Sequence, residues 1–575
     1  MKEALSIETE RMDDLPLLLT HMQRMRLAEL LDKHIPTHGH HQGLSVGELS
    51  VVWLAHLLSQ ADHRMNRVQE WGSRRLETWR GGGLERLSPE DLTDDRLADV
   101  LRLLSHDDPF RAFEQELMGQ LLRIDDLPAS GVRIDTTTAS SSADVNEQGL
   151  LQLGHSKDHR PDLPQLKLAL ASLDALGMPL ATEGLSGEQA DDLVDLPLIA
   201  RVRDGLQQSG LLYVGDCKMA ALQTRASIAA HGDFYLCPLS ALQAPPEQVR
   251  QDVETKRLQG SHLIEVCRLD KEGKRTCMAR GYETVRTLTA QVDGQSQTWQ
   301  ERRLLVPSLA ATQAAQASLQ ERLQKAEHAL AELTIRRQGK ARLRERVHVE
   351  EGIKAIVKQF RVEGLLQVQI QEPVHERPVR AYRGRLSGVR HDLTFTLTIE
   401  RGETAIAQAM DQLGWRVYAT NHLVSHLTLE QAVEAYRDEY LVERNFSRLK
   451  GHPLSLAPLY VQRDDHRIGL VRLLTLALRI LTVLEGVVRQ RLSAPQEELA
   501  GLFAGNPKRR TAQPTAEFLL EAFREVTLTV VSAPGLAQRH VTPLSSLQQQ
   551  ILVLLGFSPA VYLRLVDDSE NRPQI

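Results

Sequence analysis

The spacing of apolar residues gives the two ends of the chain a helical character. Residues 15–34, 45–60 and 91–105 repeat apolar side chains with the 3.6-residue period of an amphipathic helix. These segments predict an N-terminal helical domain over residues 1–125. We also expect a C-terminal helical region over residues 491–575.

The pattern changes to strands within residues 126–240. The segment GVRIDTTTASS (131–141) alternates, and residues 165–187 read as strand, turn and strand. Residues 188–210 return to a helical period, and LLYVGD (211–216) is a continuous apolar run, typical of a strand covered on both faces. Three strands, a helix and a further strand predict an α/β protein whose core is a mixed sheet of the ribonuclease-H kind.

Residues 241–421 depart from this pattern and predict a β-rich insertion. Strand-like pieces occur at 262–269, 365–373 and 393–402. Between them lies a helical segment with a heptad of apolar residues, Leu319, Leu323, Ala326, Leu330 and Leu333. The basic segment 336–346 that follows is either a solvated helix end or a nucleic-acid contact.

The core is expected to resume over residues 422–490 with one long helix at 428–450. A capping box of Thr428 and Gln431 starts this helix, and Gly451 stops it. An apolar stripe along this helix is expected to face a core. The position that follows the apolar residues on this stripe is the acid Glu443; the apolar residues are Leu429, Val433, Tyr436 and Tyr440.

A second helix at 468–488 is the most apolar segment of the chain. It carries Arg472 and Arg479. These charges predict a buried helix with one wet stripe, not a membrane span.

Composition and charge narrow the classes of function. The chain has 575 residues, too many for one core, and a net charge of −6. Any DNA contact must therefore come from local basic patches. The N-terminus lacks a secretory h-region. The four cysteines form no C-x2-C pair, so we expect neither a disulfide framework nor a zinc site, and a cytoplasmic location.

Three acids occupy positions that suggest a shared site. Asp135 ends the first strand, Asp216 ends the buried strand, and Glu443 lies on the inward stripe of the long helix. A strand-end Asp alone commonly caps a turn, but a carboxylate on a core-facing stripe needs a partner or a metal. Such carboxylates form an oxygen cage suited to Mg²⁺, and two ions about 4 Å apart clamp an in-line phosphoryl displacement.

The same residues carry a resemblance to a known family. YRDEYLVERNFSRLK (436–450) resembles the Y-x2-R-x3-E-x6-K signature of insertion-sequence DDE transposases that carry a β-rich insertion before their Glu. Tyr436, Glu443 and Lys450 have the required seven-residue spacing and share one helix face. RIDTTT, GHSKDHRPDLPQLK (154–167) and YVGDCKM look like the family's first-Asp strand, its hairpin and its second-Asp strand. The resemblance covers residues 130–490.

The resemblance implies a transposase that cuts DNA at element ends and joins the 3′-OH to target DNA. Asp135, Asp216 and Glu443 would be the catalytic residues and the ligands of two Mg²⁺ ions, with Mn²⁺ able to substitute. Double-stranded DNA would be the partner of a homodimer, with the N-terminal domain serving DNA-end binding or dimerisation and no membrane involved. The expected DNA contacts are Tyr436, Arg437, Arg444, Lys450, Lys157 and Arg160. The arginine of the motif is replaced by Glu439, and we expect Arg437 to take over its contact.

Other interpretations stay open at this point. A metal-dependent nuclease of the same fold would cut without joining strands. An inactive transposase-derived DNA-binding protein is disfavoured because all three acids are present. For single residues, Tyr436 could be core, Lys450 could complement a helix C-terminus, and Lys157 and Arg160 could belong to a charged hairpin face.

Overall fold

The computed structural model describes most of the chain, in two compact units. The described residues are 5–37, 42–124, 131–145, 149–157, 159–174, 176–190, 194–269, 275–307, 309–335, 345–379, 388–438, 440–494, 497–533 and 536–567. The first unit comprises Met1–Cys237, Leu288–Trp299 and Glu434–Ile575. The second comprises Pro238–Thr287 and Gln300–Val433.

The first unit contains a mixed sheet with the strand order β4-β3-β2-β5-β6. Its strands are β2 (Gly131–Ser140), β3 (Gln165–Leu173), β4 (Met178–Ser186), β5 (Leu212–Val214) and β6 (Phe234–Pro238). The pairs β2–β3 and β3–β4 are antiparallel, whereas β2–β5 and β5–β6 are parallel. Every residue of β3 is buried, as its apolar sequence requires. The predicted mixed α/β fold is confirmed.

Helices make up the largest part of the regular structure in the first unit. Its helices are α1 (Leu15–Arg24), α2 (Leu27–His34), α3 (Val46–Gln60), α4 (Met65–Ser73), α5 (Leu76–Gly81), α6 (Asp94–Leu104), α7 (Asp107–Ile124), α8 (Asp195–Leu206), α9 (Leu222–Ala230), α15 (Tyr440–Lys450), α16 (Asp464–Ser493), α17 (Ala516–Glu521), α18 (Ser546–Leu555) and α19 (Ala560–Asp567). Ser45 caps α3 through a capping box with Glu48.

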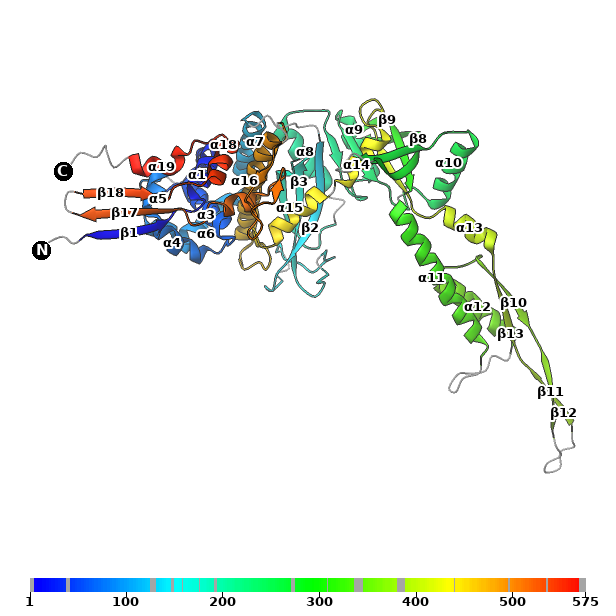
Figure 1. The fold of residues 1–575 in the computed structure, drawn as a ribbon. Coiled ribbons are helices and arrows are strands. Elements are labelled where there is room, and N and C mark those ends of the chain that lie inside the picture. The colour runs from blue at the N-terminus through cyan, green and yellow to red at the C-terminus, as the bar shows by residue number, and fades with distance from the viewer. Residues whose placement is uncertain are drawn as a thin grey trace. The chain divides into compact units, whose positions relative to one another are not determined.

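A small sheet joins the two regions that the sequence pattern predicts as helical. Strand β1 (Ser6–Arg11) pairs with β17 (Thr527–Ala533), which pairs with β18 (Leu536–Val541). Figure 1 shows these three strands side by side. The alternating β-branched run TLTVVSA accounts for β17 locally. The pairing of β1, which is almost entirely exposed, depends on that distant strand.

Helix α16 is the central helix of the first unit and packs against α6, α3, α18 and β4. Its approach to α6 requires Gly469, because an added Cβ would lie 2.1 Å from the Leu101 carbonyl oxygen. Arg472 of α16 donates to the Leu104 carbonyl at 2.8 Å and pairs with Asp107. Arg472 therefore fastens the junction of α6 and α7 to the central helix.

Arg472 and Arg479, the two arginines on which the predicted wet stripe rests, are both buried, so that prediction is wrong. Arg479 is completely buried and donates to Glu114 of α7 at 2.9 Å and to the Pro179 carbonyl at 2.8 Å. Glu114 also pairs with Arg201 of α8. The charges are tolerated inside because each has a partner of opposite charge. Among the described residues, no helix is long and apolar enough to cross a membrane.

The predicted long helix at 428–450 is two helices, α14 (Leu429–Arg437) and α15. The predicted capping box is present. The backbone N–H of Gln431 donates to the Thr428 hydroxyl, and the backbone N–H of Thr428 donates to the side-chain oxygen of Gln431. Helix α15 ends at Lys450, before Gly451, as predicted.

The second unit combines a sheet with a helical pair and a long strand ribbon. Its strand order is β14-β9-β8-β7, with β14 (Trp415–Thr420), β9 (Gln295–Pro307), β8 (Arg275–Val292) and β7 (Ile264–Leu269). The end of β8 and the start of β9, within Leu288–Trp299, belong to the first unit. The helices are α10 (Pro246–Leu258), α11 (Leu309–Leu333), α12 (Arg346–Gln359) and α13 (Glu403–Asp411). The remaining strands are β10 (Leu366–Gln371), β11 (Val374–Val379), β12 (Gly388–Leu393) and β13 (Thr396–Arg401).

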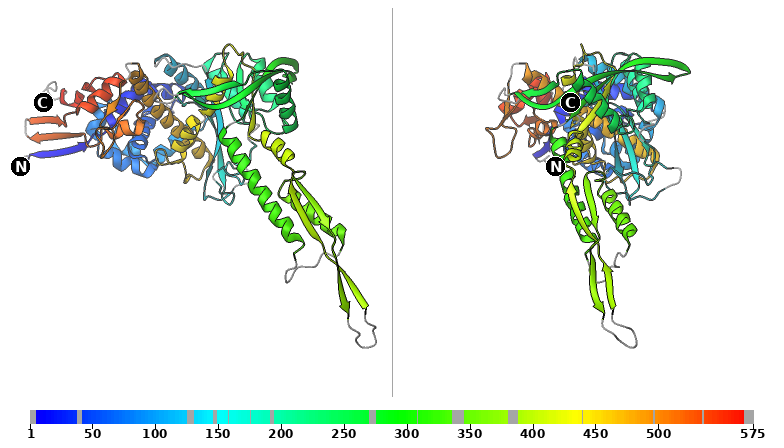
Figure 2. Two further views of the ribbon diagram at one scale, coloured as in Figure 1. Left: turned by 45° about the vertical axis from the view of Figure 1, so that its right-hand side comes forward. Right: turned by 90° about the vertical axis from the view of Figure 1, so that its right-hand side faces the viewer.

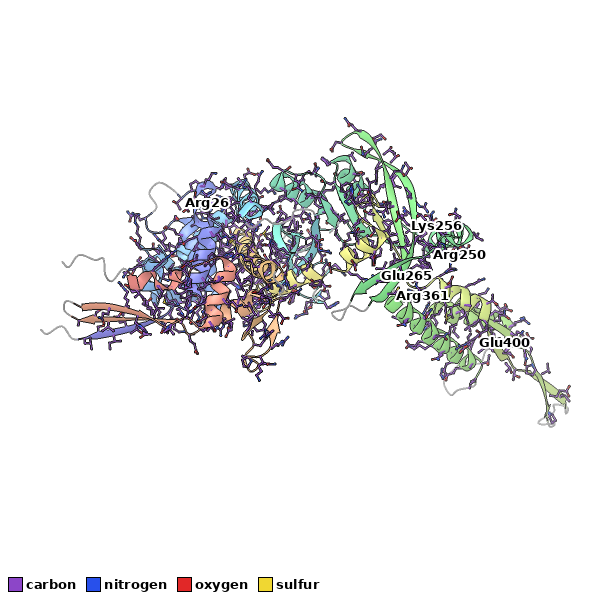
Figure 3. All side chains as sticks on the ribbon, turned by 45° about the horizontal axis from the view of Figure 1, so that its top comes forward. Arg26, Arg250, Lys256, Glu265, Arg361 and Glu400 are labelled. Carbon is purple, nitrogen blue, oxygen red and sulfur yellow. The ribbon has the colours of Figure 1, made fainter. Side chains whose placement is uncertain are left out.

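The strand pairs β10–β13 and β11–β12 follow one another as one ribbon, as both views of Figure 2 show. The predicted heptad helix is α11, and its buried residues Leu319, Leu323 and Leu330 form a core with Val362 and Ile406. On α10, Arg250 and Lys256 are charged side chains labelled in Figure 3.

The buried cluster around Glu114 generates a stability prediction. Glu114→Ala leaves Arg479 buried without its carboxylate and leaves Arg201 with Glu183 alone, and we expect the free energy of unfolding of the first unit to fall by about 3–5 kcal/mol. Urea unfolding followed by circular dichroism measures this change. The control Glu116→Ala, on the same helix, removes a solvent-exposed pair with Lys33 and should cost less than about 1 kcal/mol. Equal losses for the two variants would contradict the assignment.

Candidate active site

The parallel pairing of β2 and β5 brings Asp135 and Asp216 to neighbouring positions. Arg133 on β2 is the register partner of Val214 on β5. Two residues further along each strand stand Asp135 and Asp216. Asp216 follows the end of β5, as predicted, but Asp135 lies within β2, so the prediction that it ends the first strand is wrong. Because neighbouring strands lie about 4.8 Å apart, a distant pair in the sequence becomes an adjacent pair in the fold. The two carboxylates are close enough for Asp216 to raise the pKa of Asp135.

The Asp135 carboxyl lies in a half-buried position that disfavours its charge. Burial is the main cause that raises its pKa, and the negative charge of Asp216 adds to this effect. The charge of Lys157 and the Thr136 N–H, which donates to Asp135 Oδ1 at 2.7 Å, oppose it. Asp135 is therefore a carboxylate that gains from a nearby cation.

Lys157 supplies a cation of the chain at this position. Its Nζ lies 3.4 Å from Asp135 Oδ1 and donates to the Thr136 hydroxyl at 2.9 Å. Its backbone N–H donates to the Thr138 hydroxyl at 3.0 Å, which fixes the 154–167 segment against β2. The DNA contact predicted for Lys157 stays a prediction. In this structure the ammonium group is engaged with the acid.

Asp216 is held in place by a turn directly after β5. Its Oδ1 accepts a hydrogen bond from the Lys218 N–H at 2.9 Å, an arrangement typical of an Asp that opens a turn. The neighbouring Cys217 thiol has a raised pKa because of burial and the charge of Asp216. A raised pKa disfavours the thiolate, which is the nucleophilic form of cysteine.

Two contacts fix the helical segment that carries Glu443 along β2. Near the start of β2, Arg133 donates to the Ala435 carbonyl in the last turn of α14 at 2.5 Å. Near the other end, Lys450 Nζ donates to the Thr137 hydroxyl at 3.0 Å. Figure 1 shows α15 beside β2.

These contacts bracket Asp135 on the strand and Glu443 on the helix. Because alternate strand residues share a face, Arg133, Asp135 and Thr137 project to the same side of the sheet. Glu443 lies between Ala435 and Lys450 on the helical segment, and Asp135 lies between Arg133 and Thr137 on the strand. The part of α15 that carries Glu443 therefore runs alongside Asp135. Joint ligation of a metal by all three acids stays a prediction.

Glu443 is exposed, so the expectation that it lies on a core-facing stripe is wrong. The apolar stripe does face the core on α14, where Leu429 and Val433 are buried. On α15 it does not, because Tyr440 is 56% exposed. The interruption before α15 changes which face of the helix meets the core. The buried residues of α15 are Leu441, Val442, Asn445, Phe446, Arg448 and Leu449. An exposed Glu443 needs no buried partner, and burial is therefore no evidence for its role.

Arg444 belongs to an ion-pair cluster around the buried Glu485 of α16. Glu485 pairs with Arg444 at 2.7 Å, Arg448 at 2.5 Å and Arg489 at 2.8 Å. Arg448 also pairs with Glu517 at 2.8 Å. The structure gives the Arg444 guanidinium a structural partner, and its predicted DNA contact stays untested.

A basic cavity of about 430 Å³ adjoins the acids. Lys157, Lys167 and Lys218 line it together with His155 and Thr138. Burial lowers the pKa of Lys218, and the positive charges of Lys157 and Lys167 lower it further. The cavity thus brings three lysines together, with Glu188 as the acid among its lining residues.

Sequence reasoning missed Lys167 and Lys218. The available signals were a lysine within the apolar strand QLKLAL and a lysine two residues after Asp216. Lys167 is buried and donates to the Gln189 carbonyl. Its proximity to Lys218 depends on the sheet order, which a single sequence does not display.

The remaining predicted DNA contacts lie at the surface of the first unit. Tyr436 is half-buried and Arg437 is exposed, both in the last turn of α14. Arg160 is exposed and pairs with Asp162 at 2.7 Å. Glu439, at the motif's arginine position, and residues 336–344 of the basic segment lie outside the described residues.

Comparisons with known proteins do not assign a family to this chain. No protein-family model and no curated protein matches its sequence. Among solved structures, it is similar to piggyBac transposase in its synaptic complex with hairpin DNA, with 8% identity and a TM-score of 0.36. The match covers 99% of this chain and 88% of that chain. A likeness of this degree decides neither the fold nor the function of this chain.

The environment of Asp135 predicts how stability changes with pH. Because the folded-state pKa is raised, ionised Asp135 costs stability at neutral pH, and this cost disappears as pH falls through the raised pKa. The neutral variant Asp135→Asn should therefore be more stable than wild type at pH 7. The difference should vanish below the unfolded-state pKa of about 3.9. Thermal unfolding midpoints across this pH range measure it.

Asp162→Asn is the matched control for this experiment. The hydrogen bond from Arg160 lowers the pKa of Asp162, so neutralising this exposed residue should bring no gain at pH 7. An Asp135→Asn variant that is less stable than wild type at pH 7 would show that the pairing with Lys157 outweighs burial.

Proposed function

We propose that this protein is a DDE transposase with a ribonuclease-H-like core, which cuts DNA at element ends and joins the freed 3′-OH to target DNA. The observation that carries the proposal is the Asp135–Asp216 pair, with Asp135 on β2 and Asp216 just after the parallel neighbour β5, next to a cavity lined by lysines. A pair of carboxylates can bind a cation, and adjacent lysines can bind a phosphate. Their combination suits the transfer of a phosphoryl group in a nucleic-acid backbone.

The order of elements supports the core assignment. The chain forms β2, β3, β4, α8 and β5 in succession, the three strands, helix and strand expected of a ribonuclease-H-like sheet. The first three strands are antiparallel neighbours, and β5 returns parallel to β2. This return places the second acid beside the first.

The donor groups fit Mg²⁺, with Mn²⁺ as a substitute. Asp135 and Asp216 offer hard carboxylate oxygens, and their mutual repulsion favours a divalent cation between them. Glu443 is exposed on the helix alongside and is the third ligand that we propose. Two bound ions would supply charge stabilisation for the attacking and the leaving oxygen.

The residues of the chain bind and orient the substrate around this position. Lys167 and Lys218 would hold a phosphate in the basic cavity, while Lys450, anchored on Thr137, keeps α15 against β2. Lys157 neutralises Asp135 in this structure, so a cation that binds there must displace its ammonium group toward the phosphate. We propose a homodimer as the active assembly, because paired element ends need two such sites.

The first test of this proposal is removal of the acids. Asp135→Asn, Asp216→Asn and Glu443→Gln should each reduce Mg²⁺-dependent cleavage of DNA carrying element ends by more than about 100-fold, since even outer-shell partners of a metal ligand cost 10–100-fold. Binding of the same DNA, measured in EDTA, should stay within about threefold of wild type because no phosphate contact is lost.

The control is Asp438→Asn, which neutralises an exposed acid five residues before Glu443. This variant should cut DNA at the normal rate. Near-normal cleavage by Glu443→Gln at saturating DNA would remove Glu443 from the site. Cleavage without strand transfer by the wild-type protein would instead favour a nuclease.

The second test concerns the cavity lysines. Lys218→Met should weaken DNA binding for all sequences and reduce the slope of log affinity against log salt by about 1, because one phosphate contact is lost. Fluorescence anisotropy at several salt concentrations measures the slope. Lys33→Met removes an exposed lysine that pairs with Glu116 and should leave the slope unchanged. An unchanged slope for Lys218→Met would exclude the cavity from the DNA path.

A further inference from the structure

A pair of cysteines faces across the antiparallel strands β7 and β8 in the second unit. Val266 is the register partner of Ala279, but the next residue, Cys267, is the partner of Cys277. One residue of β8 is skipped, which is a β-bulge. In a regular ladder Cys267 would face position 278. The bulge therefore places the two thiols opposite each other.

Glu265 completes a group of three potential metal ligands. Glu265 and Cys267 alternate on β7 and so project to the same face, where Cys277 also lies. A carboxylate oxygen of Glu265 and the sulfur atoms of the two cysteines all lie within 4.8 Å of one another. Figure 3 labels Glu265 among the charged side chains of this unit. Among the described residues, this is the one group of three or more His, Cys, Asp or Glu side chains whose ligand atoms lie this close together.

We propose that Glu265, Cys267 and Cys277 bind one Zn²⁺ ion, with water as the fourth ligand. Zinc–sulfur bonds of about 2.3 Å and zinc–oxygen bonds of about 2.0–2.2 Å separate tetrahedral ligands by about 3.5–3.8 Å, so small side-chain shifts are enough here. Two thiolates select a soft or borderline ion and disfavour Mg²⁺. The site is independent of the proposed active site, whose ligands are all oxygens.

Neighbouring groups allow such an ion to bind. Glu265 forms an ion pair with Arg280 at 3.2 Å, and both side chains are about half exposed, so exchanging this pair for a metal bond costs little. Glu430 Oε1 accepts the Cys267 N–H at 3.1 Å and holds the backbone of the bulge. Binding replaces the proton of each thiol, and two protons pass to solvent.

The ion would fasten the outer strand of this sheet. Strand β7 is the last in the order β14-β9-β8-β7 and pairs only with β8 among the described strands. An edge strand with one neighbour is the part of a sheet that opens most easily. A metal that joins β7 to β8 stabilises the folded edge, because the unfolded chain offers no such ligand set.

Cobalt substitution tests the site in the full-length chain. Protein purified under reducing conditions is freed of metal and titrated with Co²⁺, and the thiolate-to-cobalt charge-transfer absorption in the near ultraviolet is recorded. Carboxylate sites do not give this absorption, so the proposed active site does not contribute. We expect one equivalent of Co²⁺ per chain to produce the band and one equivalent of Zn²⁺ to displace it.

Variants assign the band to residues. Cys267→Ser and Cys277→Ser should each abolish the two-thiolate band, whereas Cys217→Ser, an exposed cysteine of the first unit, should keep it. Glu265→Gln should keep the band but lower the Zn²⁺ affinity about 10-fold or more. Circular dichroism of each variant establishes that it is folded.

Three outcomes would overturn the proposal. The first is no charge-transfer band in wild type, and the second is a band that persists in folded Cys267→Ser. The third concerns metal-free protein that was purified under reducing conditions: mass spectrometry finds it lighter by two hydrogen atoms, with both cysteines in one disulfide-linked peptide. That result would make the pair a disulfide.

Discussion

The arrangement of the first unit depends on one buried carboxylate, Glu485 of α16. Its side chain is 2% exposed and pairs with Arg444 and Arg448 of α15 and with Arg489 of its own helix. It also accepts the Ala516 N–H at the start of α17 at 3.2 Å. A buried ion is tolerated only where its partners are held in place, so this carboxylate determines which face of α15 meets α16. The opposite side of α15 is then left for Glu443 and Lys450.

The constraint on α15 acts together with a second one on the sheet. The parallel pairing of β2 with β5 is a property of the backbone, and it places Asp135 and Asp216 together whatever the side chains prefer. Repulsion between the two acids opposes this placement, and Lys157 offsets part of it. The fold thus maintains an unfavourable pair of charges. Unfavourable arrangements that the surrounding structure enforces are concentrated at functional sites.

The sequence predicts elements well and their mutual placement less well. Apolar spacing is local, and it identified β2, the β3–β4 hairpin, β5 and α11 correctly. The sequence pattern also did not show that Arg133 binds the Ala435 carbonyl of α14, because the two residues are 302 positions apart in sequence. The wet stripe of α16 was wrong for the same reason, since the partners of Arg479 lie on α7 and on β4. Lys167 and the Cys267–Cys277 pair depend on strand register, which composition and spacing do not contain.

Local charge, not the net charge of −6, determines what the candidate site attracts. Acids and lysines are adjacent here: Asp135 lies within β2 and Asp216 just after β5, and Lys157, Lys167 and Lys218 line the cavity. In this structure Lys157 partly neutralises Asp135, and the charges of Lys157 and Lys167 lower the pKa of Lys218. Under the proposed function, a cation at the acids would release Lys157, and a phosphate in the cavity would offset the repulsion that Lys218 experiences. Each binding event would therefore favour the other, and we expect cation and nucleic acid to bind with positive coupling.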